Sequence, residues 1–216
     1  MTRIIISRAL PRFKGFVLAA LLAGGCAQQP PPAEPLPPAK PAALPPLPAT
    51  YVNSPGCPGC LAVTLTLRPD GSYLVREQLG ASEFYDFGRW RRVEGMLELV
   101  GGRDAPRHYA LRGEALDSQA GTQGGDLTRA PRLEALRGPF RLVGLYDGAL
   151  FKECRTGLAW ALADNRLTQV LKEEAAKRAS NPAFVSLDAR FEGSPEVLVL
   201  QRPAALLNAA SCPARP

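Results

Sequence analysis

The sequence predicts an almost entirely β-stranded protein with one helix, built as two small barrels behind an amino-terminal leader and a tether. Three observations predict this class. Short alternating strands recur with turn residues roughly every 8–12 positions. The length of 216 residues allows one or two domains. Ten of the 25 residues from Cys26 to Thr50 are proline, so this part of the chain is expected to be linker.

Residues 1–25 are expected to be a signal peptide. The first 14 residues carry four positive charges and no acid, and residues 15–25 are uncharged. An apolar stretch this short cannot cross a hydrocarbon core that needs about 20 residues, but it suits a secretory signal. The stretch ends in the sequence LAGGC at residues 22–26, where small residues precede a cysteine whose sulfur can accept a diacylglycerol.

This ending resembles the bacterial lipoprotein signal, so Cys26 is the predicted lipid anchor to the membrane. The alternative is an ordinary signal peptide cleaved near Gly25, which would leave Cys26 as an exposed free thiol. A lipid removes that liability in an oxidising compartment. In the lipoprotein class an Asp after the cysteine retains the protein at the inner membrane. Ala27 stands there instead, so the resemblance implies the outer membrane.

Residues 26–50 form the predicted Pro-rich tether. The run PPPAEPLPPAKPAALPPLP has no hydrophobic period and favours extended polyproline II, because proline fixes φ and cannot donate to a ladder. At about 3.1 Å per residue, such a spacer reaches up to roughly 75 Å. A proline-rich recognition ligand is the alternative interpretation.

Residues 51–136 are predicted to form an antiparallel β-barrel or meander. Residues 63–67 alternate apolar and polar side chains, as a half-buried strand does, and Pro69–Gly71 supplies the turn to a returning strand. The pattern recurs later with turns at Glu94–Gly95 and Gly113–Glu114. The predicted strands are 63–67, 73–76, 88–93, 96–100, 108–112 and 115–116.

Residues 137–216 are predicted to form an OB-fold-like barrel. Three strands, one helix and two further strands follow in that order, which is the order of a five-stranded OB barrel. Asp164 is the predicted N-cap of the helix, and Lys177 and Arg178 lie near its end. The predicted strands are 140–146, 149–151, 157–163, 184–191 and 197–201.

Charge and chemistry exclude several functions. The net charge is +6, but it falls to +2 without the leader, and basic and acidic residues are interspersed, so nucleic acid is not an expected partner. A single histidine, His108, excludes a multi-histidine metal centre or a two-histidine catalytic site. Ser186, Ser194 and Ser211 lack a nucleophile-elbow context. We therefore expect no enzymatic activity.

Several motifs resemble the NlpE-type family of envelope-stress and copper-resistance lipoproteins. They are CPGC at 57–60 with the hairpin that follows, GRW at 88–90, DGALFKECRTG at 147–157, and Cys212. The resemblance covers residues 51–216. It implies a lipocalin-like amino-terminal barrel, a carboxyl-terminal OB-fold, and an outer-membrane lipoprotein that faces the periplasm after transport by the lipoprotein-sorting machinery. It also implies signalling to a periplasmic sensor kinase on surface contact, disulfide failure or copper.

Four cysteines remain besides Cys26, and an even number in the envelope indicates disulfide bonds. Three connectivities are possible. The resemblance and the separate domains favour Cys57–Cys60 and Cys154–Cys212. The second bond is either a structural staple or, as the family implies, a sensor that reports failed disulfide formation.

The CPGC motif at Cys57 and Cys60 has several interpretations. A thioredoxin-type site needs a helix after the first cysteine, and a strand follows here. Zinc would want four ligands, and no second pair lies nearby. Copper(I) accepts two thiolates and fits the family's link to copper. A short disulfide that tightens the barrel mouth is the alternative to metal binding.

The sequence thus predicts a non-enzymatic sensor or adaptor for envelope stress, with no required cofactor and copper as a candidate ligand. The competing hypothesis is a lipoprotein that binds copper or a lipophilic ligand without signalling. A barrel mouth with Trp90 and Tyr85 is the candidate site for such an apolar ligand.

Overall fold

The computed structural model describes residues 44–57, 59–102, 105–178, 182–208 and 212. All of these belong to one compact unit that begins at Lys40. The predictions for the leader, for Cys26 and for most of the tether therefore lie outside the described residues. Within the described part of the chain, the predicted fold class is confirmed: strands dominate and one helix is present.

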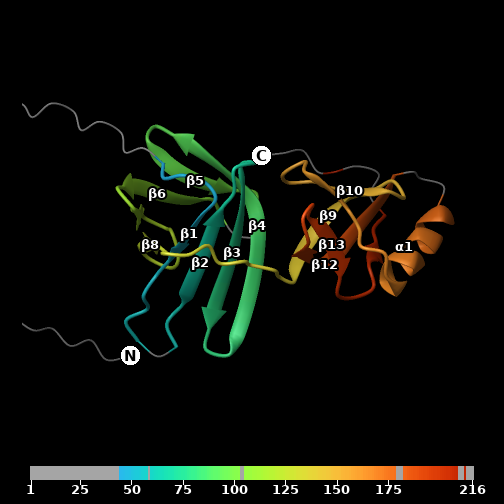
Figure 1. Ribbon diagram of the computed structural model, residues 1–216, viewed down its shortest axis with the longest axis horizontal. Coiled ribbons are helices and arrows are strands. Elements are labelled where there is room, and N and C mark those ends of the chain that lie inside the picture. Colours follow the sequence, from blue (N-terminus) through green and yellow to red (C-terminus); the bar gives the residue numbers. More distant parts are fainter. Residues whose placement is uncertain (1–43, 58, 103–104, 179–181, 209–211, 213–216) are drawn as a thin grey trace, which may run out of the picture. The chain divides into compact units, whose positions relative to one another are not determined.

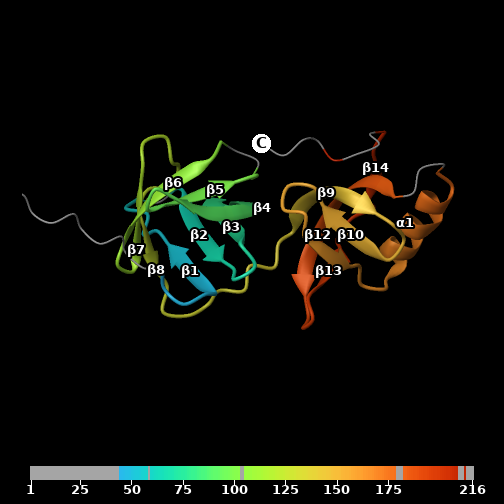
Figure 2. The same cartoon turned by 90° about the horizontal axis from the view of Figure 1, so that it is seen from above.

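The first eight strands close into an antiparallel barrel (Figures 1 and 2). They are β1 (Ala49–Val52), β2 (Ala62–Leu67), β3 (Ser72–Leu79), β4 (Ser82–Val93), β5 (Met96–Val100), β6 (Arg107–Arg112), β7 (Ala115–Ser118) and β8 (Leu127–Arg129). The barrel closes where β1 pairs with both β2 and β8. Alternate side chains point inward and fill the interior with Tyr51, Val63, Leu65, Leu67, Tyr73, Val75, Leu97, Leu99, Tyr109, Leu111, Leu116 and Leu127.

The hairpin turns follow from local chemistry. The Asp70 side chain accepts hydrogen bonds from the backbone and hydroxyl of Ser72, and Gly71 takes a left-handed φ of 79° between β2 and β3. Between β4 and β5, Glu94 and Gly95 both have positive φ, as a two-residue hairpin with the right strand twist requires. The turns predicted at these positions are confirmed.

The remaining strands form a second, nearly closed barrel. They are β9 (Phe140–Tyr146), β10 (Leu150–Glu153), β11 (Ala159–Ala161), β12 (Ala183–Glu192), β13 (Val197–Leu200) and β14 (Ala205–Leu206). The sheet order is β11-β10-β9-β12-β13, and β14 pairs with β12. A parallel bridge between Leu162 and Leu198 brings the two end strands together. The predicted order of three strands, helix and two strands is confirmed, and β14 is an additional short strand after them.

The single described helix, α1 (Arg166–Ala176), joins β11 to β12 and packs Leu171 into the core of the second barrel. The predicted N-cap, Asp164, is wrong by one residue. The Asn165 side chain accepts the hydrogen bond from the backbone N–H of Thr168, at 3.0 Å, and Asn165 is extended while Arg166 begins the helix. Both residue types can cap a helix, and only the backbone geometry decides between them.

Strand limits differ from the predicted ones at several places. β1 begins at Ala49, so the last two residues of the predicted tether belong to the barrel. β4 begins at Ser82, six residues before the predicted start, because its residues 82–89 pair with the whole of β3. Strands β1, β8 and β14 were not predicted, since four, three and two residues are too few to show a clear alternation.

The apolar core of the second barrel extends onto the outer wall of the first. Leu74 of β3 and Phe87 of β4 point outward from the first barrel, and both are buried in the core of the second. The Phe87 ring contacts Trp160 and Phe191, with centroids 5.6 Å and 5.8 Å away. The outer wall of the first barrel therefore completes the interior of the second.

Among the described residues, no helix has the length and apolar character needed to cross a membrane.

Candidate functional site

The disulfide between Cys154 and Cys212 ties the carboxyl-terminal segment to the second barrel. Cys154 follows β10 directly and is 6% exposed, and its backbone N–H donates to the carbonyl of Val143 in β9. The two cysteines are separated by 58 positions. A cross-link over that distance removes a large loop-closure entropy from the unfolded chain, worth about 4 kcal/mol in the chain-entropy model.

Cys154 lies within a tight turn, residues 153–157, that is organised around a buried carboxylate. The Glu153 side chain is fully buried and accepts hydrogen bonds from the backbone N–H and the hydroxyl of Thr156, at 2.7 and 2.8 Å. It also pairs with Arg155 at 3.0 Å. A buried carboxylate is costly unless it is paired and hydrogen-bonded, so these contacts fix the conformation of the turn.

The same turn connects to the first barrel. Arg155 forms a second ion pair, at 3.2 Å, with Asp86 of β4, whose side chain is 11% exposed. The Arg89 guanidinium, also from β4, donates to the carbonyl of Thr156. Burial alone would lower the pKa of Arg155, but Glu153 and Asp86 raise it above its ordinary value. The turn next to Cys154 is thus held to β4 by a charged pair and a charge-assisted hydrogen bond.

Sequence reasoning identified Cys154 but not Asp86 or Arg89. Glu153, Arg155 and Thr156 stand in the motif that carries the family resemblance, whereas their partners lie 67 and 69 positions away. No local pattern connects residues so distant in sequence. The only signal in the sequence was the charge of Asp86 between two aromatic residues, Tyr85 and Phe87.

The second disulfide, Cys57–Cys60, closes the loop between β1 and β2 at one end of the first barrel. Both cysteines are exposed, and the backbone N–H of Cys60 donates to the carbonyl of Cys57. Asn53 holds the base of the loop: its amide donates to the carbonyls of Leu61 and Gly124, and it accepts from the N–H of Val63. A strand follows Cys60, so the helix dipole of a thioredoxin-type site is missing here.

The residues around Cys57 and Cys60 do not fit a copper(I) site as they stand. Their sulfurs are joined in a disulfide and offer no thiolate ligand. Among the described residues, no cluster of three or more His, Cys, Asp or Glu side chains could hold a metal ion. Metal binding at this pair would first require reduction of the bond.

Two further residues lie apart from their expected surroundings. Trp90 packs against the interior of the first barrel and donates its indole N–H to the carbonyl of Arg68. Tyr85 lies on the outer face of β4 and contacts Phe140 edge to face. Residues five positions apart on a strand point to opposite faces, so these two do not line one ligand site. His108 is half-buried on β6, and its Nε2 lies 3.2 Å from the Glu98 carboxylate.

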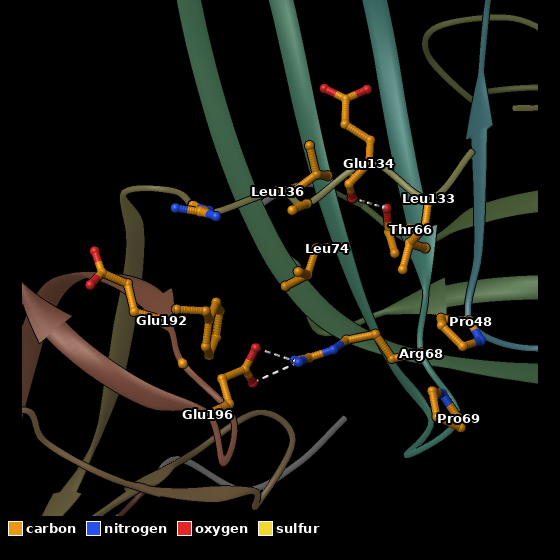
Figure 3. Close-up of a pocket in the computed structure, with 14 residues that line it drawn as sticks. Pro48, Thr66, Arg68, Pro69, Leu74, Leu133, Glu134, Leu136, Glu192 and Glu196 are labelled. Carbon is orange, nitrogen blue, oxygen red and sulfur yellow. Dashed lines mark hydrogen bonds and ion pairs between the residues drawn. The ribbon is translucent and has the colours of Figure 1, made fainter. Parts of the chain in front are cut away.

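A groove of about 520 Å³ lies where the two barrels meet. Figure 3 shows Arg68, the residue directly after β2, and Glu196 of the β12–β13 turn pointing toward one another across it. The Arg68 guanidinium reaches both carboxylate oxygens of Glu196 at 2.6 Å and lies over the Phe191 ring. This pair gives the barrels a second charged contact, separate from the one at Arg155.

Residues 132–211 match the family model of the NlpE C-terminal OB domain. Lipoprotein NlpE of Escherichia coli strain K12 is 27% identical over 180 residues, which cover 74% of this chain and 76% of NlpE. The crystal structure of the Cpx pathway activator NlpE from Escherichia coli is 24% identical, covers 77% of this chain and 98% of that one, and has a TM-score of 0.35. The family match and the relative confirm the resemblance predicted from the sequence.

Proposed function

We propose, on the premise that this chain is an NlpE-type protein, that it is a non-enzymatic outer-membrane lipoprotein that senses envelope stress. The premise rests on the OB-domain match over residues 132–211 and on the similarity to Lipoprotein NlpE. NlpE of Escherichia coli is described as an activator of the Cpx pathway. By extension, the output of this chain would be a periplasmic two-component sensor kinase.

The proposed anchor is an acylated Cys26, produced when the signal peptide of residues 1–25 is removed. Ala27 after the cysteine would allow the sorting machinery to deliver the lipoprotein to the outer membrane, facing the periplasm. The Pro-rich segment would then act as a semi-rigid spacer between the membrane and the first barrel. That geometry places the folded part where it can meet a periplasmic partner.

The observation that carries the proposal is the Cys154–Cys212 bond within the OB-type domain. Without this bond, the segment after β13 would be held by the two-residue β14 pairing, by the Leu207 N–H on Phe184, by packing of Ala204 and Leu206 on the core, and by one exposed hydrogen bond from Arg178 to Asn208. Failure of disulfide formation in the periplasm would therefore release this segment. Such a release would make the exposed surface of the protein depend on whether the periplasm can form this disulfide. Surface contact and copper are the other stimuli that the family suggests.

The test replaces Cys212 with Ser in the cell and measures an envelope-stress reporter. We expect a higher output than from the unchanged protein, and the same increase for Cys154→Ser, because either change abolishes the same bond. Cys57→Ser is the matched control, since it removes a different disulfide. Immunoblotting keeps the protein levels comparable. Unchanged output from both Cys154→Ser and Cys212→Ser would sink the sensor proposal.

The second candidate function is copper carriage by the first barrel at Cys57 and Cys60, after reduction of their disulfide; the lipophilic cargo expected at Trp90 and Tyr85 is not proposed, because these side chains lie on opposite faces of β4. It is favoured by one observation, the exposure of the Cys57–Cys60 pair on a loop at the barrel end. Co-purification with a sensor kinase that depends on the redox state of Cys154 would favour the adaptor. Stoichiometric copper without any captured partner would favour the carrier.

A further inference from the structure

The Cys154 turn is shared between the disulfide and the contact to β4. Cys154 has Glu153 on one side and Arg155 on the other, and the ion pairs of Arg155 run to Glu153 and to Asp86. The next residue, Thr156, receives the Arg89 guanidinium on its carbonyl. Every residue of the turn that flanks the sulfur is therefore engaged either with the buried Glu153 carboxylate or with β4.

We infer that docking of β4 on this turn and the Cys154–Cys212 bond stabilise each other, so that Asp86 and Arg89 set how readily the disulfide is reduced. The inference deepens the proposed sensor function and takes its biological meaning from it. Its physical content is a coupling between two sites in one molecule. Such a coupling is reciprocal: if docking favours the oxidised form, oxidation must favour docking by the same factor.

Packing supports the coupling independently of charge. Cys154 lines a groove together with Tyr85, Asp86 and Arg155, so the wall of the first barrel forms one side of the approach to the sulfur. Close contact extends to the β5–β6 connection, because the Asp86 carboxylate lies so close to Gly102 that a Cβ there would collide with it. Asp86 is thus packed on the side of the first barrel while it pairs with Arg155 of the turn.

The redox step itself is an ordinary thiol–disulfide exchange with a dithiol reductant. A thiolate of the dithiol attacks one sulfur of the Cys154–Cys212 bond, and the other sulfur leaves as a thiolate and takes up a proton. The second thiol of the reductant then resolves the mixed disulfide. Two electrons and two protons pass from the dithiol to the protein, and the reductant ends as its own disulfide.

The experiment measures the equilibrium between the purified full chain and dithiothreitol, with Cys57 and Cys60 replaced by Ser so that one disulfide remains. Alkylation of free thiols followed by mass spectrometry gives the reduced fraction. For Asp86→Asn we expect the equilibrium constant for reduction to rise about 5- to 150-fold, the usual span of site-to-site coupling. Asn keeps the hydrogen bond that Asp86 accepts from the N–H of Phe87 and removes only the charge.

Two further variants make the result decisive. Arg89→Gln breaks the other contact to the turn and should shift the constant in the same direction, including in the event that Asp86→Asn fails to fold. Glu114→Gln is the matched control. Glu114 is largely exposed, and its ion-pair partner, Arg129, belongs to the same barrel, so this change leaves the contact between β4 and the Cys154 turn intact. Its constant should equal that of the parent chain.

Hydrogen exchange provides the reciprocal measurement. Reduction of the parent chain should accelerate amide exchange in β4 around Phe87, by a factor comparable to the shift that Asp86→Asn causes in the redox constant. Unchanged redox constants in Asp86→Asn and Arg89→Gln, or an equal change in Glu114→Gln, overturn the inference. That outcome leaves the sensor proposal standing, whereas an unchanged reporter with Cys212→Ser overturns the sensor proposal and leaves the coupling measurable.

Discussion

At the scale of single residues, the four cysteines of the described chain divide by burial. Cys57 and Cys60 are exposed on a loop, and Cys154 lies buried in a turn with charged neighbours. A reagent or metal therefore reaches the first pair from solvent, while the Cys154 bond responds to the packing around it. The two disulfides are alike in the sequence but differ in accessibility in the folded protein.

Copper binding at the exposed pair gives a prediction at this scale. In a chain with Cys154 and Cys212 both replaced by Ser, we expect the oxidised protein to take up no copper(I), because a disulfide has no thiolate to offer. After reduction, the copper proposal expects one ion per pair, and further replacement of Cys57 by Ser should abolish it. A copper(I) titration with a competing chromophoric ligand measures both. No uptake by the reduced pair even at micromolar metal would eliminate this site.

Single residues also show which contacts can be predicted from the sequence. Turn residues such as Asp70 and Gly71 act on neighbours two or three positions away, so their effect can be predicted from the sequence. The pairing of Arg155 with Asp86 depends on how two domains pack, and no spacing rule reaches it. Trp90 and Tyr85 are an intermediate case. The two-residue period places their side chains on opposite faces of the strand, but only once the strand is known to be continuous.

At the scale of elements, α1 is a short helix whose beginning is fixed by one side chain. Asn165 caps it through Thr168, while the neighbouring Asp164 is exposed and precedes the cap. The helix carries no acidic residue in its first turn and no basic residue in its last. With no such charges to complement the helix dipole, the cap contributes a large part of the local stabilisation.

Replacement of Asn165 by Ala should lower the free energy of unfolding by about 0.5–2 kcal/mol, the usual value of an N-cap. Asn165→Asp should be nearly neutral, because a carboxylate also accepts the Thr168 N–H and faces the positive end of the helix dipole. Urea denaturation followed by circular dichroism measures the difference. Asp164→Ala is the control at the position that the sequence favoured, and a loss there as large as at Asn165 would contradict this assignment.

Long elements with clear alternation could be predicted from the sequence, and short ones could not. The sequences of β2 and β12 alternate apolar and polar residues, which predicts strands there, whereas only the first half of β3 was predicted. β1 follows a proline-rich run and contributes only four residues, and its pairing of Tyr51 with Arg129 spans most of the first barrel. Barrel closure is thus a long-range event that single-strand patterns do not encode.

At the scale of the whole molecule, the shared core makes the second barrel depend on the first. Phe87 is fully buried against Trp160 and Phe191, although it belongs to β4. The Arg68–Glu196 pair, with side chains 19% and 27% exposed, adds a partly screened charged contact. The two barrels are therefore expected to unfold as one cooperative unit.

Phe87→Ala tests this expectation. Loss of a fully buried aromatic side chain costs about 3–5 kcal/mol, and here the loss should fall on the second barrel as well as the first. Hydrogen exchange in β12 should accelerate, although the change lies in another domain. Phe84→Ala is the control, because Phe84 lies three residues earlier on the same strand and is 42% exposed. Slow exchange in β12 despite Phe87→Ala would show that the barrels are energetically independent.

Strand alternation predicts that Leu74 and Phe87 point away from the first barrel's interior. It does not predict that another domain covers them, because outward apolar residues are common on protein surfaces. The two barrels and their separate cores could thus be predicted from the sequence. The contacts between the Cys154 turn and β4 depend on how the barrels pack, and they could not be predicted.

The strand that closes the first barrel is also the one that continues from the tether. β1 is bonded to β2 on one side and to β8 on the other, and nothing but the proline-rich run precedes it after Cys26. If Cys26 carries the proposed lipid, tension on it would arrive at β1 and load the β2 ladder and the β8 ladder. The barrel would therefore resist opening at β1, and mechanical stress would reach the barrel interior only after the hydrogen bonds of both ladders break.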